Sequence, residues 1–188
     1  MDLVVTATAA EMSRLQHLCP SEVQFLVSGV GLVETTFRLT SYLHKHPGVT
    51  RIFNVGICGG FLSADIAVLD YCLASSETIG DLGICFDSHT ESLDLEFLAM
   101  GNHYPCENAT RIHFSEWLSR SGYSFHLGQF LSVNSVSGSV RRGEMINRDH
   151  CICENMEGAA VARVCLGLGL DWIEFRVISN MVEDRDLS

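Results

Sequence analysis

Basic residues are scarce in this sequence. Among its 188 residues, 12 Lys and Arg stand against 23 Asp and Glu, which gives a formal net charge of −11. Proteins that bind the phosphate backbone of a nucleic acid carry clustered positive charge. Here Arg141-Arg142 is the only basic doublet, for which a solvated helix end is favoured over the alternative of a phosphate contact. We therefore expect no nucleic-acid partner.

Long apolar runs are also absent. No stretch approaches the roughly 20 apolar residues that a membrane-spanning helix needs. The start of the chain, Met1-Asp2-Leu3-Val4-Val5, lacks the basic region and the apolar core of a signal peptide. These features predict a cytoplasmic protein without a membrane partner.

Paired metal-binding motifs are missing as well. The eight cysteines are irregularly spaced, and no two of them form a CxxC pair. Without an export signal, we interpret them as reduced thiols that serve as small core residues. The eight histidines are dispersed, so no zinc or other metal site is predicted.

Neither of two common nucleotide-binding motifs occurs. The chain contains no GxGxxG and no P-loop ending in Gly-Lys-Ser/Thr. Three glycine-rich junctions nevertheless follow apolar stretches. Glycine lets backbone N–H groups approach a ligand, and ligands of open α/β sheets bind at the carboxyl ends of strands. A tight turn from strand to helix explains each junction equally well. The junctions are Ser28-Gly29-Val30-Gly31, Gly56-Ile57-Cys58-Gly59-Gly60 and Val136-Ser137-Gly138-Ser139.

Apolar periodicity alternates between strand and helix patterns along the chain. With 47% hydrophobic and 19% charged residues, the composition is that of a globular protein. Alternating strands and helices are typical of a largely parallel sheet covered by helices. We therefore expect one α/β domain, residues 1–188, with three α/β/α layers around a twisted, mixed sheet. Residues 77–91 are predicted to form a polar excursion. Predicted strands cover residues 3–8, 23–28, 51–55, 71–75, 125–133 and 172–178, and helices cover 9–18, 32–44, 109–119, 139–147 and 156–168.

Four polar residues stand beside these apolar elements. Glu11 follows the first strand, where a helix dipole favours an acid. Glu157 begins an apolar helix just after Asn155, which is a good N-cap. Arg176 lies in the middle of the last strand and would be costly to bury alone, so it should meet a carboxylate. Asn180 closes that strand, where a turn residue also fits.

Taken in order, these residues and junctions resemble a known superfamily. It comprises purine nucleoside phosphorylases and methylthioadenosine/adenosylhomocysteine nucleosidases. Within it, the chain is most similar to the futalosine hydrolases of menaquinone biosynthesis. The resemblance covers nearly the whole chain. It rests on Glu11, Ser28-Gly29-Val30-Gly31-Leu32, Asn54-Val55-Gly56-Ile57-Cys58-Gly59-Gly60, Ser137-Gly138-Ser139, Met156-Glu157 and Arg176-Val177-Ile178-Ser179-Asn180.

The resemblance implies a role for each of these positions. Glu11 resembles the general base that activates the attacking water, and Arg176 resembles the arginine that orients this base. Glu157 resembles the glutamate that holds the ribose hydroxyls, with Met156 packed on the sugar. Asn180 stands where adenine-specific nucleosidases have an aspartate that protonates the purine. Further substrate contacts are implied for Ser135, Val136, Gly31, Gly56 and Ile57.

The asparagine at position 180 favours a 6-oxopurine. An amide can donate to the carbonyl oxygen of hypoxanthine and accept from its ring N–H. Futalosine carries hypoxanthine, so the resemblance implies hydrolysis of futalosine to hypoxanthine and dehypoxanthinyl futalosine. Residues 6–10 contain neither Gly nor Arg, and Ile57 stands where the phosphorylases often have a serine. Water is therefore favoured over phosphate as the nucleophile.

Other functions stay open. The chain could be a nucleosidase for methylthioadenosine or adenosylhomocysteine, a purine nucleoside phosphorylase, or a non-catalytic nucleoside-binding protein. The superfamily implies a small-molecule purine nucleoside as ligand, a homo-oligomer (a dimer or larger), and neither a metal nor an organic cofactor. Because the chain ends at Ser188, eight residues after Asn180, we expect the domain to lack the last helix of the superfamily.

Overall fold

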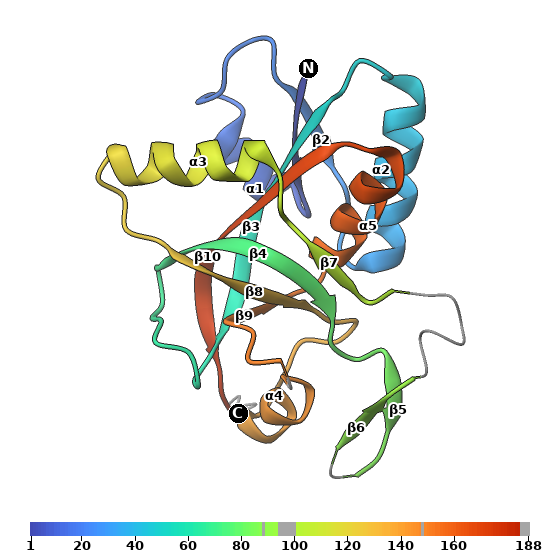
Figure 1. The fold of residues 1–188 in the computed structure, drawn as a ribbon, viewed down its shortest axis with the longest axis vertical. Coiled ribbons are helices and arrows are strands. Elements are labelled where there is room, and N and C mark those ends of the chain that lie inside the picture. The colour runs from blue at the N-terminus through green and yellow to red at the C-terminus, as the bar shows by residue number, and fades with distance from the viewer. Residues whose placement is uncertain (88, 94–100, 148, 185–188) are drawn as a thin grey trace.

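A sheet of eight strands forms the centre of the molecule (Figure 1). The computed structural model describes residues 1–87, 89–93, 101–147 and 149–184. The strands of the sheet are β1 (Asp2–Thr6), β2 (Gln24–Val27), β3 (Arg51–Phe61), β4 (Tyr71–Ile79), β7 (His103–Pro105), β8 (His126–Ser132), β9 (Cys153–Asn155) and β10 (Asp171–Val182). A separate hairpin pairs β5 (Gly83–Cys85) with β6 (Thr90–Ser92). The helices are α1 (Ala9–Leu15), α2 (Leu32–Lys45), α3 (Ala109–Arg120), α4 (Val140–Ile146) and α5 (Gly158–Leu168).

The sheet is mixed, as the sequence predicted, and part of it closes on itself. β1 pairs in parallel with β2 and β3, and β8 pairs in parallel with β4 and β9. β10 runs parallel to β3 along one edge and antiparallel to β4 along the other. Because β9 also pairs with β3, strands β10, β4, β8, β9 and β3 form a closed circuit. The sequence pattern did not predict this closure, because it depends on long-range pairing.

β3 is longer than the predicted strand, because residues 56–60 continue it instead of forming a turn. These residues pair with β10 as far as Phe61. Glycine at position 56 allows other side chains to approach the backbone of β3 closely. A Cβ on residue 56 would lie 2.7 Å from Nη1 of Arg176 and 2.8 Å from Oε1 of Glu11. The absent side chain therefore makes room for two polar groups beside the strand.

The prediction of a polar excursion at residues 77–91 is wrong for its first residues, which belong to a strand. β4 continues through Glu77 to Ile79, and Glu77 is fully buried. A glutamate in a buried strand looks like a loop residue in the sequence, but here its polar partners come from other elements. The last strand also extends beyond its predicted end, to Val182. The chain end after residue 184, on which the expectation of a missing helix bears, lies outside the described residues.

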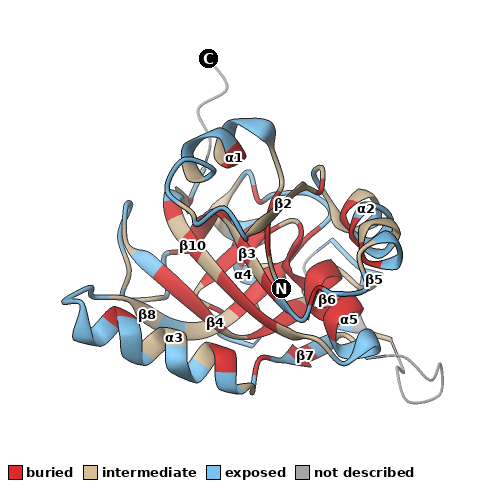
Figure 2. Ribbon diagram, turned by 90° about the horizontal axis from the view of Figure 1, so that it is seen from above, coloured by how far each residue is buried: buried red, intermediate tan, exposed pale blue. Residues whose placement is uncertain are grey.

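Helices cover both faces of the sheet. α2 and α5 lie together on one side, and α3 lies on the other (Figure 1). Side chains on opposite faces of β10 show the physical reason. Trp172 is buried in the core shared with α5, whereas Phe175 meets Phe114 of α3 with ring centroids 5.7 Å apart. In Figure 2 the central strands and α5 are largely buried, while much of α2 and α3 faces solvent. No helix among the described residues is long and apolar enough to cross a membrane.

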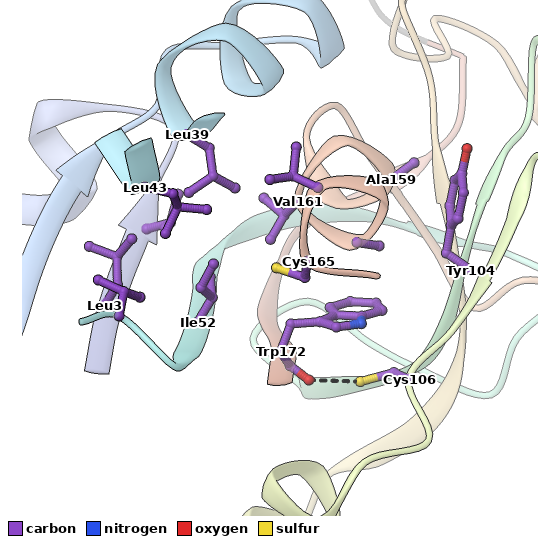
Figure 3. Packing of buried hydrophobic residues seen from close by; sticks show 14 residues of the cluster. Leu3, Leu39, Leu43, Ile52, Tyr104, Cys106, Ala159, Val161, Cys165 and Trp172 are labelled. Atoms are coloured by element: carbon purple, nitrogen blue, oxygen red, sulfur yellow. Dashed lines mark hydrogen bonds between the residues drawn. The ribbon is translucent and has the colours of Figure 1, made fainter. Parts of the chain in front are cut away.

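The largest hydrophobic core joins α2 and α5 to the strands beneath them (Figure 3). Leu39 and Leu43 of α2 belong to the same buried cluster as Val161 of α5. Each fully buried side chain of this kind contributes roughly 1.5–3 kcal/mol. The thiol of Cys106 donates to the carbonyl oxygen of Trp172 at 3.1 Å. Six of the eight cysteines are buried, in agreement with their expected role as small core residues, whereas Cys19 and Cys85 are not.

Gly158, the first residue of α5, should not tolerate a side chain. A Cβ there would overlap Oε1 of Glu77 and Oε2 of Glu174, two carboxylates without exposure to solvent. We predict that Gly158→Ala lowers the free energy of unfolding by about 3 kcal/mol, as overpacking of a rigid interior does. Urea unfolding followed by circular dichroism measures the change.

The matched control lies in the same helix. Gly167 is exposed, and a Cβ there would displace only the end of the flexible Arg163 side chain. Gly167→Ala should raise the free energy of unfolding by up to about 1 kcal/mol through helix propensity. Equal effects of the two substitutions would contradict the overlap at Gly158.

Candidate active site

A pocket of about 270 Å³ lies where the ends of several strands meet the start of α5. Six separate segments of the chain contribute to it, from the turn after β1 to the end of β10. Its position agrees with the rule that ligands of α/β sheets bind at strand ends. The lining residues are Ala7, Thr8, Glu11, Val30, Ile57, Cys58, Gly59, Val136, Glu154, Asn155, Met156, Glu157, Arg176, Ser179 and Asn180.

Most of the residues predicted for the site line this pocket. Seven of the ten do so, namely Glu11, Ile57, Val136, Met156, Glu157, Arg176 and Asn180. Gly56 lies behind the wall, next to the groups that its missing Cβ accommodates. Gly31 donates its backbone N–H to Oε1 of Glu157 at 3.2 Å, so it acts on the site through that carboxylate. Ser135 is exposed and is not among the lining residues, whereas its neighbour Val136 is, so a substrate contact of Ser135 stays a prediction.

A capping box fixes the carboxylate of Glu11. Thr8 is the N-cap of α1, and its N–H and hydroxyl donate to Oε2 of Glu11 at 2.9 and 2.7 Å. Glu11 therefore satisfies both interpretations of its position, since it supports the helix start and also lines the pocket. None of the described residues donates a hydrogen bond to Oε1. This second oxygen is left to accept a proton from a bound molecule.

Glu157 and Arg176 form a buried ion pair in the pocket wall. Nη1 of Arg176 lies 3.4 Å from Oε2 of Glu157, and the two side chains are 2% and 6% exposed. The prediction that Arg176 would meet a carboxylate is confirmed. The same Nη1 donates to the carbonyl oxygen of Ile57 at 3.2 Å. A carboxylate offers about four acceptor sites, so Glu157 keeps capacity for the hydroxyl groups of a ligand.

Arg176 holds a second carboxylate, that of Glu174. Its Nε donates to Oε1 of Glu174 at 2.8 Å. Burial disfavours the guanidinium charge, but Glu174 and Glu157 outweigh burial and raise the pKa of Arg176, so the cation is retained. Among the described residues, Arg176 forms no ion pair with Glu11, although both approach Gly56. The hydrogen bonds that hold Glu11 come from Thr8, and orientation of Glu11 by Arg176 stays a prediction.

A β-bulge brings Asn180 into the pocket. The pairing register of β10 with β3 shifts between Ile178 and Asn180, so that Ser179 and Asn180 both line the pocket. Bulges commonly redirect side chains beside functional sites. The hydroxyl of Ser179 donates to Oδ1 of Asn180 at 2.9 Å, and Nδ2 donates to the carbonyl oxygen of Met181 at 3.0 Å. An amide nitrogen carries two hydrogens, so one N–H of Asn180 is available to a ligand.

Comparison of the sequence with family models gives one match. The model of the phosphorylase superfamily matches residues 20–187. The chain belongs to the phosphorylase superfamily. Of the six segments that line the pocket, only the one with Thr8 and Glu11 precedes the matched range.

Two curated relatives of this superfamily member are named futalosine hydrolase. The protein from Thermus thermophilus is 27% identical over 171 residues, which cover 86% of this chain and 71% of the relative. The protein from Acidothermus cellulolyticus is 26% identical over 204 residues, which cover 98% of this chain and 81% of the relative.

Solved structures share the fold of this superfamily member. A futalosine hydrolase mutant of Helicobacter pylori superposes with a TM-score of 0.84 at 20% identity, covering 97% of this chain and 86% of that chain. A mutant methylthioadenosine/adenosylhomocysteine nucleosidase of Helicobacter pylori, with 5′-methylthioadenosine in its active site, gives a TM-score of 0.83 at 18% identity with the same coverage. Both confirm the predicted nucleoside phosphorylase/hydrolase-like fold.

The sequence did not reveal the role of Glu154, a buried carboxylate in the middle of β9. Its two oxygens accept hydrogen bonds from the N–H and the hydroxyl of Ser137, both at 2.7 Å. Glu154 thereby anchors the loop that carries Val136 along the pocket. Its position within three residues of Glu157 was the only available signal. Among the residues that the structure describes, no group of three or more His, Cys, Asp or Glu side chains is placed to hold a metal ion.

Two further carboxylates, Glu77 and Glu174, lie side by side under the start of α5. Glu174 could have been found from the sequence, since it stands two residues before Arg176 and a strand places such residues on one face. No feature of the sequence around Glu77 indicates that it is buried or belongs to the site. Burial, and then the charge of Glu174, raise the pKa of Glu77 well above its ordinary value. Burial also raises the pKa of Glu174, although Arg176 opposes this.

The raised pKa of Glu77 should make the folded state less stable as the pH rises. Above the ordinary glutamate pKa of about 4.3, the unfolded chain has released a proton that the folded chain still binds. The free energy of unfolding then falls by up to about 1.4 kcal/mol per pH unit, until the pH passes the folded-state pKa. We predict that Glu77→Gln removes this loss. Urea unfolding of both proteins between about pH 5 and pH 8 measures it, and identical slopes would contradict the raised pKa.

Proposed function

We propose that this protein hydrolyses the N-glycosidic bond of futalosine, releasing hypoxanthine and dehypoxanthinyl futalosine in menaquinone biosynthesis. Three side chains gathered in one pocket support this function: the carboxylates of Glu11 and Glu157 and the amide of Asn180. The two relatives named futalosine hydrolase, matched over most of the chain, support the choice of substrate.

The sugar binds at Glu157. Its carboxylate is held by the N–H of Gly31 and by Arg176, and its remaining acceptor sites face the pocket. Two ribose hydroxyls can donate to these sites in charge-assisted hydrogen bonds. As the glycosidic bond breaks, positive charge develops on the sugar, and a nearby carboxylate stabilises that charge more than it stabilises the ground state. Met156 supplies an apolar surface for the sugar from the same segment.

Glu11 acts as the general base. Oε1 accepts a proton from a water molecule, which attacks the anomeric carbon while the bonding electron pair leaves with the purine. The capping box holds Oε2 and so presents Oε1 in one orientation. Such orientation removes the entropy cost of placing the base in each turnover.

Asn180 recognises the leaving purine. Its free amide N–H can donate to the carbonyl oxygen of hypoxanthine, and so stabilise the electron pair that the purine gains. Adenine has an amino group instead of that carbonyl, so the amide would lose this partner. The identity of residue 180 therefore selects the base.

Water fits this pocket better than phosphate does. A phosphate dianion needs several donors, which are usually cationic. Among the described residues that line the pocket, Arg176 is the one Lys or Arg, and Glu174 and Glu157 already neutralise it. Ile57, which is 54% exposed, offers an apolar side chain at the wall.

The alternative functions are two other enzymes of the superfamily and a non-catalytic binding protein. A methylthioadenosine nucleosidase or a purine nucleoside phosphorylase would share the fold, but the first needs a donor suited to adenine and the second needs a phosphate site. A non-catalytic nucleoside-binding protein would keep the pocket and lack turnover. The product formed from each nucleoside separates these possibilities.

We also propose that the protein forms a homo-oligomer, a dimer or larger. The outer face of α2 is apolar, with Val33 81% exposed and Phe37 67% exposed. Val30, which precedes this helix, lines the active-site pocket. A second copy on this face would bury apolar surface and lie beside the pocket.

We place the reaction in the cytoplasm. All eight cysteines are free thiols. Free thiols in this number are typical of a reducing compartment.

A substrate assay tests the proposed reaction. Futalosine, methylthioadenosine and inosine are incubated with the protein, with and without phosphate, and chromatography follows the free base. We expect hypoxanthine from futalosine at a rate that phosphate does not change. The kcat/KM should exceed that for methylthioadenosine at least about a hundredfold, because a mismatched hydrogen bond leaves buried groups unpaired.

Each other outcome of this assay has a distinct meaning. Release of base from methylthioadenosine alone would overturn the substrate assignment. A strict requirement for phosphate would overturn hydrolysis. Binding of all three nucleosides without release of base would establish the non-catalytic alternative.

Replacing Glu11 by Gln should remove turnover and retain binding. We predict that Glu11→Gln lowers kcat about a hundredfold to ten-thousandfold, the usual contribution of a general base. The amide can still accept the hydrogen bonds from Thr8, so α1 keeps its cap. Stopped assays measure kcat, and calorimetry with futalosine measures binding. Glu34→Gln, which changes the first-turn glutamate of α2 outside the pocket, is the control and should keep the wild-type rate. A fully active Glu11→Gln enzyme would show that another group is the base.

A further inference from the structure

Three buried carboxylates and one guanidinium lie together beside the pocket. Glu77 and Glu174 are both 0% exposed, Glu157 is 5% exposed, and Arg176 is 2% exposed. Arg176 contacts Glu174 and Glu157, but no Lys or Arg among the described residues forms an ion pair with Glu77. If all three acids were ionised, the cluster would carry a net charge of −2, and two of its carboxylates, Glu77 and Glu174, would have no exposure to solvent. Such a charge is too costly to bury, so the cluster must retain a proton.

The contact between Glu77 and Glu174 shows where that proton lies. Oε1 of Glu77 and Oε2 of Glu174 meet in the space that a Cβ on residue 158 would fill. No described residue donates a hydrogen bond to Oε2 of Glu174, whereas its Oε1 accepts from Nε of Arg176. Two adjacent carboxylates in a dry site cannot both ionise, and they share one proton. A proton between Glu77 and Glu174 gives the unpartnered oxygen its donor.

The charges around the pair decide which acid is neutral. Glu174 faces Arg176 on its own strand, which favours the carboxylate form, and Glu157 faces the pair from the start of α5. The other titratable groups close to the pair are the thiols of Cys106 and Cys153 and that of Cys151. Burial raises the pKa of each of these thiols, so they stay neutral. The negative charge therefore rests on Glu174, and Glu77 is the protonated partner.

Glu77 is also linked to the start of α5. Nδ2 of Asn155 donates to Oε1 of Glu77, and the hydroxyl of Ser132 donates to Oε2 at 2.9 Å. Oδ1 of Asn155 accepts the backbone N–H groups of Glu157 and Gly158 at 2.9 and 2.7 Å. In this way Glu77 sets the orientation of the amide that holds the first residues of the helix.

The hydroxyl of Ser132 continues the same link. Its oxygen accepts the backbone N–H of Ala159 at 2.8 Å while its hydrogen points to Glu77. Free N–H groups at a helix start need such acceptors. The backbone N–H groups of residues 157–159 are thus held by the side chains of Asn155 and Ser132. Both of these side chains also donate a hydrogen bond to Glu77.

We propose that Glu77 is a positioning residue whose proton, shared with Glu174, holds Arg176 and the start of α5 so that the Glu157 carboxylate faces the ribose. One negative charge at Glu174 balances Arg176 and leaves its Nη1 for Glu157. A second negative charge at Glu77 would draw the guanidinium away from Glu157. Without the charge at Glu174, Arg176 would pair with Glu157 alone. The guanidinium would then occupy the oxygens of Glu157 that the ribose hydroxyls need. The role in ribose binding rests on the proposed nucleosidase function, whereas the shared proton does not.

Infrared spectroscopy tests the proton without any substrate. At neutral pH, wild-type protein should show the C=O stretching band of a protonated carboxyl group, and the difference spectrum against Glu77→Gln should contain that band. Absence of the band from the difference spectrum would overturn the shared proton. This result would stand whichever nucleoside the protein hydrolyses.

Kinetics with futalosine test the positioning role. Gln at position 77 can donate to Glu174 through its amide nitrogen and accept from Ser132 through its oxygen, as the neutral acid does, but that nitrogen cannot accept from Asn155. Because two of the three contacts remain, KM should change by no more than about threefold. Glu174→Gln should raise KM at least about tenfold, because Glu157 is then held by Arg176 away from the sugar. A simple loss of folded protein lowers kcat and leaves KM unchanged, so the rise in KM identifies misplacement of Glu157.

Two further variants complete the test. Glu77→Leu removes the acceptor for Asn155 and Ser132 and should raise KM as Glu174→Gln does. Glu116→Gln changes an exposed glutamate of α3 and should match the wild type. A KM for Glu77→Gln as high as that for Glu77→Leu would overturn the proposal. Should Glu174→Gln fail to fold, the infrared band and the contrast between the two Glu77 variants still decide it.

Discussion

The buried guanidinium of Arg176 is the interaction on which the rest of the pocket depends. An unpaired cation with 2% exposure would destabilise the fold, so the chain surrounds it with Glu174 on its own strand and Glu157 at the start of α5. The same need explains the glycine at position 56, since a side chain there would collide with the guanidinium. The cation thus dictates the sequence on three elements, β3, β10 and α5.

This arrangement ties stability to the proposed chemistry. The carboxylate that neutralises Arg176 from α5 is also the one that faces the pocket, so folding energy holds Glu157 in place before any ligand arrives. Such preorganisation reduces the cost of binding and of charge development on the sugar. Glu11 follows the same principle by a different route, because the capping box that begins α1 also orients its carboxylate. In both cases an interaction that stabilises the fold also orients a carboxylate of the site.

Several of these features were accessible from the sequence, and the physical reason differs from one to the next. The strands and helices follow from local periodicity, and the need of Arg176 for a carboxylate follows from the cost of a buried charge. The glycines at residues 56–60 left a turn and a close approach equally open, because glycine marks both. Glu77 was assigned to a polar excursion, because a lone acid after an apolar strand gives no sign of the partners that bury it. The placement of Asn180 depends on a bulge that only strand pairing reveals.

The sequence by itself determined which chemical groups are present: an amide at position 180, acids at positions 11 and 157, and a single arginine to meet them in the last strand. Side-chain types and short-range patterns carry that information, because it needs no knowledge of distant neighbours. Only the tertiary structure decided which acids the arginine meets and which pair of acids touches. Direct pairing of β4 with β10 brings Glu77 and Glu174 together under α5. The physical reason is that a buried charge is stabilised by whatever lies within a few ångströms, and distance along the chain does not fix distance in space.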